Sequence, residues 1–83
     1  MNIIEILKQG ICNINVVIEK EHIQENEGLL ASGILDSYGF VEFLGFIESE
    51  FGITVEDDEF TAANFRDLTA MKKYIEAKLG NKK

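Results

Sequence analysis

One serine stands out as a group that could take part in chemistry. Ser37 follows Asp36 at the point where a loop gives way to an amphipathic pattern, so we expect Ser37 on the first turn of a helix. A hydroxyl at a helix start lies near unpaired backbone N–H groups and the positive end of the helix dipole. That position suits a phosphate ester, although Asp and Ser at such places most often serve only as N-caps.

The residues around Ser37 form a longer pattern. The run from Leu29 to Ser37 reads LLASGILDS, and Tyr38 follows it. This run resembles the attachment motif of acyl carrier proteins and peptidyl carrier proteins, in which Asp-Ser-Leu follows a Gly-hydrophobic-Leu turn. The resemblance covers Leu29 to Leu79, and more loosely the first helix. Its further landmarks are Val41-Glu42, Ile47-Glu48, Phe51-Gly52-Ile53 and Asn64-Phe65-Arg66-Asp67-Leu68.

The resemblance implies a role for Ser37 as the acceptor of a phosphopantetheine group, which a phosphopantetheinyl transferase moves from coenzyme A. The terminal thiol of that arm would hold an acyl or aminoacyl unit as a thioester. Loading enzymes and downstream biosynthetic enzymes would recognise the second helix and its cap. Carried over from the family, the recognition residues are Asp36, Tyr38, Val41, Glu42, Gly45 and Glu48.

Two of these positions depart from carriers of fatty-acid synthesis. Tyr38 replaces the usual Leu, and Gly45 stands where a larger apolar residue is common. These departures argue against a role in fatty-acid synthesis. The Phe-rich run 38–43 and the segment 64–68 resemble free-standing carriers in specialised biosynthetic pathways. The alternatives are an acyl carrier protein of fatty-acid synthesis, a carrier-like fold with unmodified Ser37 that serves only for binding, and a small acidic interaction protein.

The charge pattern limits the partners. The net charge is −7, and eleven acidic residues lie between Lys20 and Arg66 with no Lys or Arg among them. Such a surface repels nucleic acid and anionic membranes and attracts proteins with basic patches. We therefore expect a chain that binds neither nucleic acid nor membrane. Because the sequence shows neither a signal peptide nor a stretch long enough to span a bilayer, we expect a cytoplasmic protein, and we expect a monomer. The eleven acids are Glu21, Glu25, Glu27, Asp36, Glu42, Glu48, Glu50, Glu56, Asp57, Asp58 and Glu59.

Little in the sequence points to an enzyme. A serine hydrolase needs a base for its serine, and the only histidine, His22, lies in a polar loop. Cys12 is the only cysteine, and the acidic run 56–59 lacks the alternation and central glycine of a calcium loop. We therefore expect no catalytic residue and no metal site.

Hydrophobic periodicity predicts an all-α fold, a four-helix bundle with a short third helix, as in acyl carrier proteins. We expect one carrier domain over residues 1–79 and a frayed tail over 80–83. The inward stripe of the second helix should be Phe40, Leu44, Ile47 and Phe51, with Phe43 at its flank. The expected helices run from Asn2 to Ile18, from Ser37 to Glu50, from Thr61 to Phe65, and from about Asp67–Thr69 to Leu79.

Overall fold

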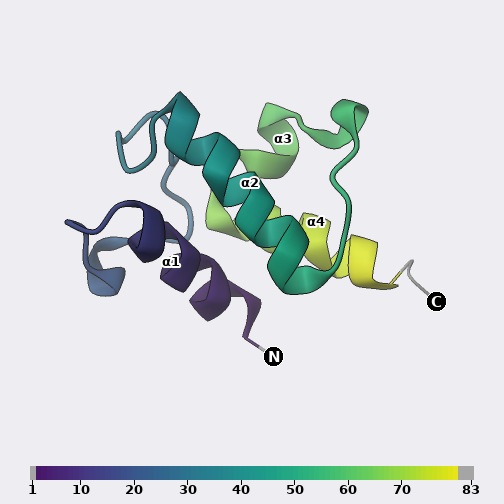
Figure 1. The fold of residues 1–83 in the computed structure, drawn as a ribbon, viewed down its shortest axis with the longest axis horizontal. Helices are drawn as coiled ribbons and strands as arrows, with labels where there is room; N and C mark the ends of the chain where they lie inside the picture. Colours follow the sequence, from purple (N-terminus) through teal and green to yellow (C-terminus); the bar gives the residue numbers. More distant parts are fainter. Residues whose placement is uncertain (1, 81–83) are drawn as a thin grey trace.

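The computed structural model describes residues 2–80 and confirms an all-α protein, with no strand in that part of the chain. Figure 1 shows α2 lying across the molecule, with α1 beside it and α3 and α4 behind it. Two single-turn 3₁₀ helices, η1 and η2, lie in the connections. The elements are α1 (Ile3–Ile14), η1 (Lys20–His22), α2 (Ser37–Phe51), η2 (Asp57–Glu59), α3 (Ala62–Phe65) and α4 (Leu68–Gly80).

Helix α1 is shorter than its periodicity predicts, and the expected end at Ile18 is wrong. The helix ends at Ile14 because Asn15 turns the chain. The Asn15 amide donates to the Ile34 carbonyl at 2.8 Å and accepts the Val17 N–H at 3.2 Å. A side chain that bonds backbone groups outside the helix offers them an alternative to the helical ladder, so α1 stops there.

Helix α2 confirms the predicted element to within one residue. Gly52 ends it in the left-handed conformation, with φ of 65°. The predicted inward stripe is wrong in one respect, because Phe43 is fully buried whereas Leu44 is only half-buried. The buried face therefore follows Phe40, Phe43 and Ile47.

Helix α3 and helix α4 begin near their predicted starts. The Thr61 hydroxyl caps α3 by accepting the Asn64 N–H at 3.3 Å. The buried carboxylate of Asp67 accepts the Ala70 N–H at 2.9 Å, which satisfies a donor in the first turn of α4. Gly80 closes α4, and residues 81–83 of the predicted tail lie outside the described residues.

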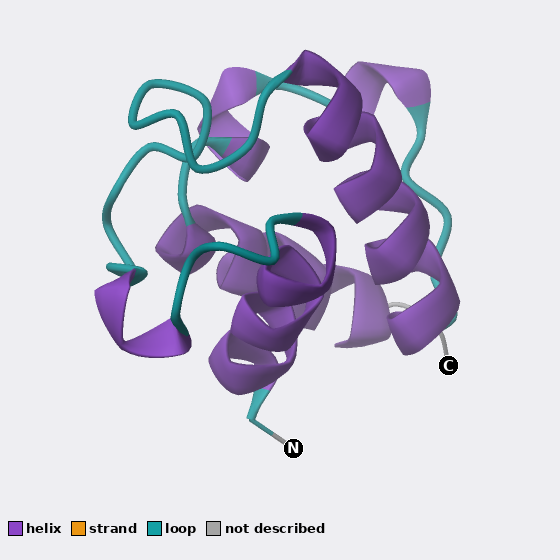
Figure 2. Cartoon of the chain, turned by 60° about the vertical axis from the view of Figure 1, so that its left-hand side comes forward, coloured by secondary structure: helices purple, strands orange, loops and turns teal. Residues whose placement is uncertain are grey.

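The long connection between α1 and α2 is fixed against the rest of the protein and so determines where α2 begins. Leu29 is fully buried in this connection, and its N–H donates to the Arg66 carbonyl at 3.1 Å. The Glu25 carbonyl accepts both the N–H and the hydroxyl of Thr69, at 3.0 and 3.1 Å. Figure 2 shows this connection wrapping one side of the bundle.

One hydrophobic core joins all four α-helices and the long connection. Helix α3 contributes Phe65 to it. The fully buried side chains come from α1, the long connection, α2 and α4. They are Leu7, Ile11, Leu29, Phe43, Ile47, Leu68, Met71 and Ile75. Among the described residues, no helix is long and apolar enough to cross a membrane.

Candidate functional site

Ser37 is the first residue of α2, as the sequence predicts, and it is exposed. Within residues 2–80 its hydroxyl makes no hydrogen bond. In Figure 1, α2 starts at the top of the view, away from the end of α4. The hydroxyl is therefore open to an enzyme that approaches this end of the molecule.

Asp36 holds the helix start in place. Its carboxylate accepts the Gly39 N–H at 2.7 Å, and its carbonyl accepts the Phe40 N–H at 2.8 Å. The N-cap interpretation is therefore confirmed for Asp36, and the Ser37 side chain takes no part in capping the helix. The N–H groups of Ser37 and Tyr38 have no partner among the described residues, so they remain available to an anion at the helix start.

The approach to Asp36 is a tight, self-bonded turn. Gly33 has φ of 82°, a conformation that glycine adopts with little strain. The Ser32 hydroxyl donates to the Leu29 carbonyl and accepts the Ile34 N–H, and the Leu35 N–H donates to the Leu29 carbonyl. This turn explains why a Gly-hydrophobic-Leu sequence precedes the serine.

The other aliphatic hydroxyls differ from that of Ser37 in partner or position. Ser32, Thr61 and Thr69 bond to backbone groups. Ser49 is exposed in the last turn of α2, where the helix dipole is negative. Thr54 is exposed in the loop that follows α2. Among the described residues, Ser37 alone has an exposed hydroxyl at a helix start that makes no hydrogen bond.

Most of the predicted recognition residues share the exposed side of α2. Tyr38 is 75% exposed and Val41 63% exposed. Glu42 and Gly45 are exposed as well, and Asp36 lies at the head of the helix. Five of the recognition residues form a surface that we call the α2 face. They are Tyr38, Val41, Glu42, Gly45 and Glu48.

Glu48 differs from the other members of the α2 face, because it is half-buried. Its carboxylate accepts the Val55 N–H at 2.8 Å, which ties the chain after α2 to that helix. Part of its hydrogen-bonding capacity therefore serves the fold. The remaining oxygen is the one that a partner could contact.

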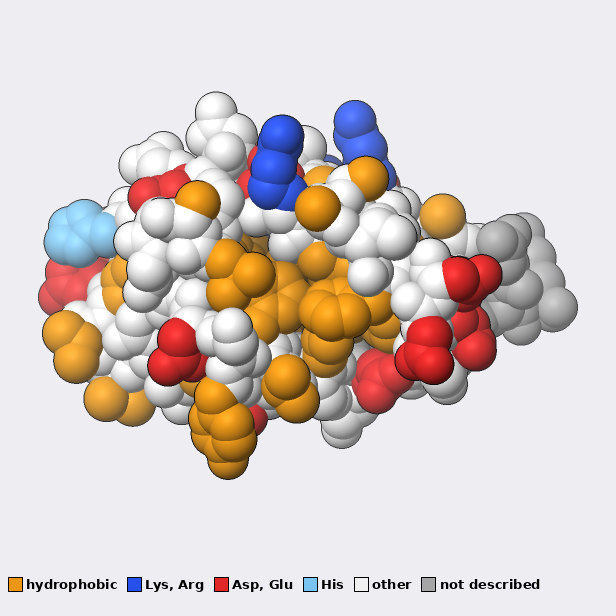
Figure 3. Space-filling model, turned by 90° about the horizontal axis from the view of Figure 1, so that it is seen from above, with side chains coloured by type: hydrophobic (Ala, Val, Ile, Leu, Met, Phe, Trp, Pro, Cys, Tyr) orange, Lys and Arg blue, Asp and Glu red, His pale blue; other side chains and the backbone are white. Residues whose placement is uncertain are grey.

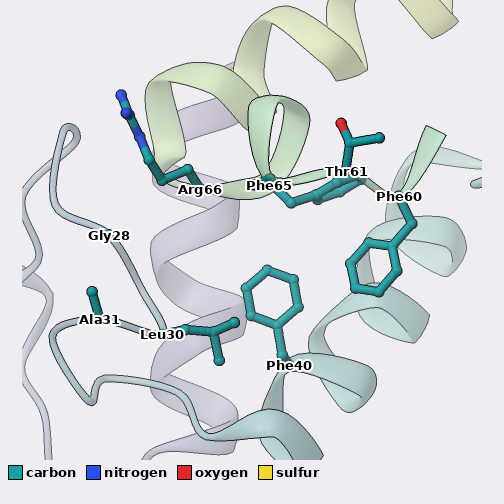
Figure 4. A pocket seen from close by; sticks show the side chains of 9 residues that line it. Gly28, Leu30, Ala31, Phe40, Phe60, Thr61, Phe65 and Arg66 are labelled. Atoms are coloured by element: carbon teal, nitrogen blue, oxygen red, sulfur yellow. The ribbon is translucent and has the colours of Figure 1, made fainter.

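An apolar pocket lies beside α2, and motif-based reasoning from the sequence missed it. Its volume is about 330 Å³, and in Figure 4 the side chains of Leu30, Phe40, Phe60 and Phe65 point toward one another across it. Phe40 stands one helical turn after Ser37. Phe60 is 48% exposed at the pocket.

A polar cluster forms around Glu59, the residue directly before Phe60. Glu59 accepts hydrogen bonds from the Tyr74 hydroxyl at 2.8 Å and from Lys78 Nζ at 2.9 Å. The Glu56 N–H, Lys78 and Tyr74 lower the pKa of Glu59 from 4.5 to about 2. Burial and the Glu59 carboxylate raise the pKa of Tyr74 above its usual range. The cluster anchors η2 to α4, directly before Phe60.

A second pocket flanks Asp36 on the side of α1. Its volume is about 310 Å³, and it lies between the Val16–Val17 turn and the residues Asp36 and Gly39. Both valines are highly exposed. This pocket could not be predicted from the sequence, because the predicted first helix continues through the turn.

The surface around the site is apolar with acidic borders. Figure 3 shows hydrophobic side chains gathered in the middle of one face, with acidic side chains on either side. His22 lies in η1, in the long connection, and is not among the residues that line either pocket. Within residues 2–80 no group of His, Cys, Asp and Glu side chains could hold a metal ion.

Comparison with known proteins agrees with the geometry of the helix start. The family described as "Phosphopantetheine attachment site" matches residues 5–71, a range that contains the tight turn, Asp36, Ser37 and the α2 face. The chain is also similar to the D-alanyl carrier protein of Streptococcus suis (strain 98HAH33). The two are 43% identical over 56 residues, which cover 65% of this chain and 71% of that protein. The small helical bundle with its exposed loop-to-helix junction therefore belongs to the phosphopantetheine attachment family, the carrier proteins with a covalently bound phosphopantetheine.

Proposed function

We propose that Ser37 is the attachment residue for phosphopantetheine and that the chain carries an acyl or aminoacyl unit between biosynthetic enzymes. The observation that carries this proposal is the exposed, unbonded Ser37 hydroxyl at the start of α2. This hydroxyl lies inside the range matched by the attachment family. Neither Ser49 nor the backbone-bonded hydroxyls share that setting.

The residues present fit a phosphate ester at this position. The hydroxyl is accessible, and the free N–H groups of Ser37 and Tyr38 lie beside it at the positive end of α2. In the attachment reaction the Ser37 oxygen forms a bond to the phosphorus that bears the pantetheine. The pyrophosphate bond of coenzyme A breaks, and adenosine 3′,5′-bisphosphate leaves.

The proton of the Ser37 hydroxyl needs an acceptor during this transfer. The nearest carboxylate along the chain is that of Asp36, which already accepts the Gly39 N–H. We infer that the phosphopantetheinyl transferase supplies the base and the metal ion. The chain would then be the substrate of that enzyme and not a catalyst.

A covalent arm explains why so small a domain can serve several enzymes. The bound phosphopantetheine ends in a thiol, which holds the cargo as a thioester. Tethering keeps the cargo at a high effective concentration near each partner and prevents its loss between steps. The α2 face supplies exposed apolar and acidic side chains, so the partners should present apolar and basic groups.

Intact-protein mass spectrometry tests the attachment residue. After incubation with coenzyme A and a transferase of broad specificity, the wild-type chain should gain one phosphopantetheine. Ser49→Ala should behave in the same way, since it removes a hydroxyl from the other end of α2. Ser37→Ala should gain none, and an adduct on that variant would overturn the proposal.

We further infer that the cargo is an aminoacyl unit, with D-alanine as the first candidate. The support is the similarity to a D-alanyl carrier protein over most of both chains. Hydroxylamine treatment of the chain purified from its source cells should release alanine hydroxamate of D configuration. Release of a fatty hydroxamate would reject this cargo.

The pocket beside α2 favours a second candidate, an apolar acyl chain. Its lining includes Leu30, Phe40, Phe60 and Phe65, and burial of an acyl chain there would remove apolar surface from water. If the cargo enters this pocket, the octanoyl form should melt at a higher temperature than the D-alanyl form. Equal melting temperatures would exclude an acyl chain held in the pocket.

A further inference from the structure

Two exposed valines lie in the turn after α1, and the fold holds that turn in place. Val16 is 83% exposed and Val17 is 88% exposed. The Asn15 amide accepts the Val17 N–H at 3.2 Å and donates to the Ile34 carbonyl at 2.8 Å. The turn is therefore tied to the approach to Ser37, and its two apolar side chains are exposed on an ordered backbone.

The valine turn and the start of α2 enclose the pocket of about 310 Å³ beside Asp36, which we call the α1 pocket. Asp36 and Gly39 belong to its lining, and they lie one residue before Ser37 and two residues after it. The volume falls at the lower end of the range of about 300–1,000 Å³ for small-molecule sites. A ligand attached at Ser37 would start beside this pocket.

Gly39 keeps part of the α1 pocket open. A Cβ atom at this position would lie 3.2 Å from an Asp36 carboxylate oxygen, 3.4 Å from a methyl group of Ile14 and 3.6 Å from a methyl group of Leu35. All three of these neighbours line the pocket as well. A side chain at residue 39 would therefore occupy space that the lining residues enclose.

The lining combines apolar side chains with free backbone donors. Ile14, Leu35 and the two valines supply apolar surface. The N–H groups of Val16 and Asp36, two residues of the lining, have no partner among the described residues. The pocket beside α2 differs, because apolar side chains make up most of its lining. The α1 pocket therefore suits a ligand that carries both methyl groups and amide carbonyls.

We propose that the α1 pocket binds the pantetheine portion of the arm on Ser37. Pantetheine carries two geminal methyl groups, which would contact Val16 and Val17. It also carries two amide carbonyls, which would accept from the free N–H groups of the lining. A tethered ligand has a high effective concentration, so even a weak site is occupied. This inference rests on the proposed attachment at Ser37.

Continuity with the attachment residue favours the arm over a partner protein as the occupant. The arm is joined to the chain between two residues of the lining, Asp36 and Gly39. A protein surface could cover the two valines from outside. Gly39 is buried, however, and the space that it leaves suits a narrow chain better than a protein surface.

Nuclear magnetic resonance spectroscopy of the modified chain tests this site. Nuclear Overhauser effects (NOEs) should join the geminal methyl groups of the arm to the methyl groups of Val16, Val17 and Ile14. The amide resonances of Val16 and Val17 should also shift when the arm is attached. Ser37→Glu adds negative charge without an arm and should not reproduce these shifts.

Two variants separate the α1 pocket from the pocket beside α2. The double variant Val16→Ser and Val17→Ser removes the apolar wall, and the NOEs from the arm to Ile14 should then be lost. Leu30→Ser removes an exposed apolar side chain from the other pocket and should retain all of the NOEs. The three replaced side chains are exposed, so both unmodified variants should melt within about 4 °C of wild type.

Each outcome decides the question. NOEs from the arm to Leu30 or Phe60 in place of the valines would put the arm in the pocket beside α2 and overturn the inference. A modified wild-type chain without NOEs from the arm to the valines or Ile14 would overturn it as well, while the attachment at Ser37 stands. If the wild-type chain is never modified, the proposed function fails and the inference fails with it. The wild-type measurement is decisive even where a variant does not fold.

Discussion

At the scale of single residues, Asp36 and Ser37 have separate roles at the start of α2. Asp36 accepts the Gly39 N–H and so supplies the cap that a helix start needs. Ser37 is left with a free hydroxyl on an ordered backbone. A reactive group that plays no part in stability can be modified without disturbing the fold.

Ser37→Ala should therefore abolish carrier activity and leave stability almost unchanged. The hydroxyl is exposed and has no partner among the described residues, so its removal should change the free energy of unfolding by no more than about 0.5 kcal/mol. Urea denaturation followed by circular dichroism measures this change. A loss of several kcal/mol would mean that Ser37 is structural.

The lowered pKa of Glu59 leads to a prediction about how stability depends on pH. Its pKa is lowered to about 2 by the Glu56 N–H, Lys78 and Tyr74. A carboxylate whose pKa is lower in the folded state stabilises the fold above its unfolded pKa, and that stability is lost as pH falls toward 2. Glu59→Gln should lower the melting temperature at pH 7 and should flatten its decline between about pH 4.5 and pH 2.

A matched variant isolates the hydrogen bond from the charge in this cluster. Tyr74→Phe removes one donor to Glu59 and leaves the ion pair with Lys78 in place. It should retain most of the acid-dependent decline that Glu59→Gln removes. An identical pH profile for wild type and Glu59→Gln would contradict the role of the cluster.

At the scale of elements, the sequence predicted α2 within one residue because its ends carry strong local signals. Asp36 caps the start, and Gly52 supplies the left-handed end. The end of α1 could not be predicted in this way. Asn15 stops that helix by bonding to Ile34, which is nineteen residues away, and hydrophobic spacing carries no information about such a contact.

In the candidate site, too, the features that depend on local sequence could be predicted, and those that depend on long-range contacts could not. Ser37 follows from a local motif, and the residues of the α2 face follow from the resemblance to carrier proteins. The apolar pocket does not, because it joins Leu30, Phe40, Phe60 and Phe65 from three separate segments. The bond from the Val55 N–H to Glu48 could not be predicted from the sequence either, since it depends on the turn after Gly52.

The cap at Asp36 gives a prediction for α2 as an element. Asp36→Ala removes the acceptor for the Gly39 N–H and should cost about 0.5–2 kcal/mol of stability. Asp36→Asn keeps a side-chain oxygen at that position and should cost less. Urea denaturation of the two variants compares them, and equal losses would show that the charge and not the cap is what matters.

At the scale of the whole molecule, the distribution of charge sets how partners meet the chain. Residues 21 to 65 include eleven Asp and Glu residues and no Lys or Arg, and the net charge is −7. A field of one sign speeds encounters with oppositely charged surfaces, and salt screens it over about 10 Å at 0.1 M. Association with partner enzymes should therefore be faster at low ionic strength.

Glu42→Lys should reduce this electrostatic attraction on the α2 face. The exposed side chain lies one and a half turns from Ser37, so a positive charge there would oppose a basic enzyme. Modification should be slower than for wild type at low salt, and the difference should shrink as salt is added. Glu76→Lys, an exposed site on α4, makes the same change in net charge and should have a smaller effect.

The most direct test of the attachment site is tandem mass spectrometry of the chain purified from its source cells. Fragmentation of the proteolytic peptide that contains residues 33–43 can assign a phosphopantetheine to one residue, because Ser37 is the only serine or threonine in that range. We expect the adduct on Ser37 and an unmodified Ser49. A phosphopantetheine on any other residue, with Ser37 unmodified, would contradict the central proposal.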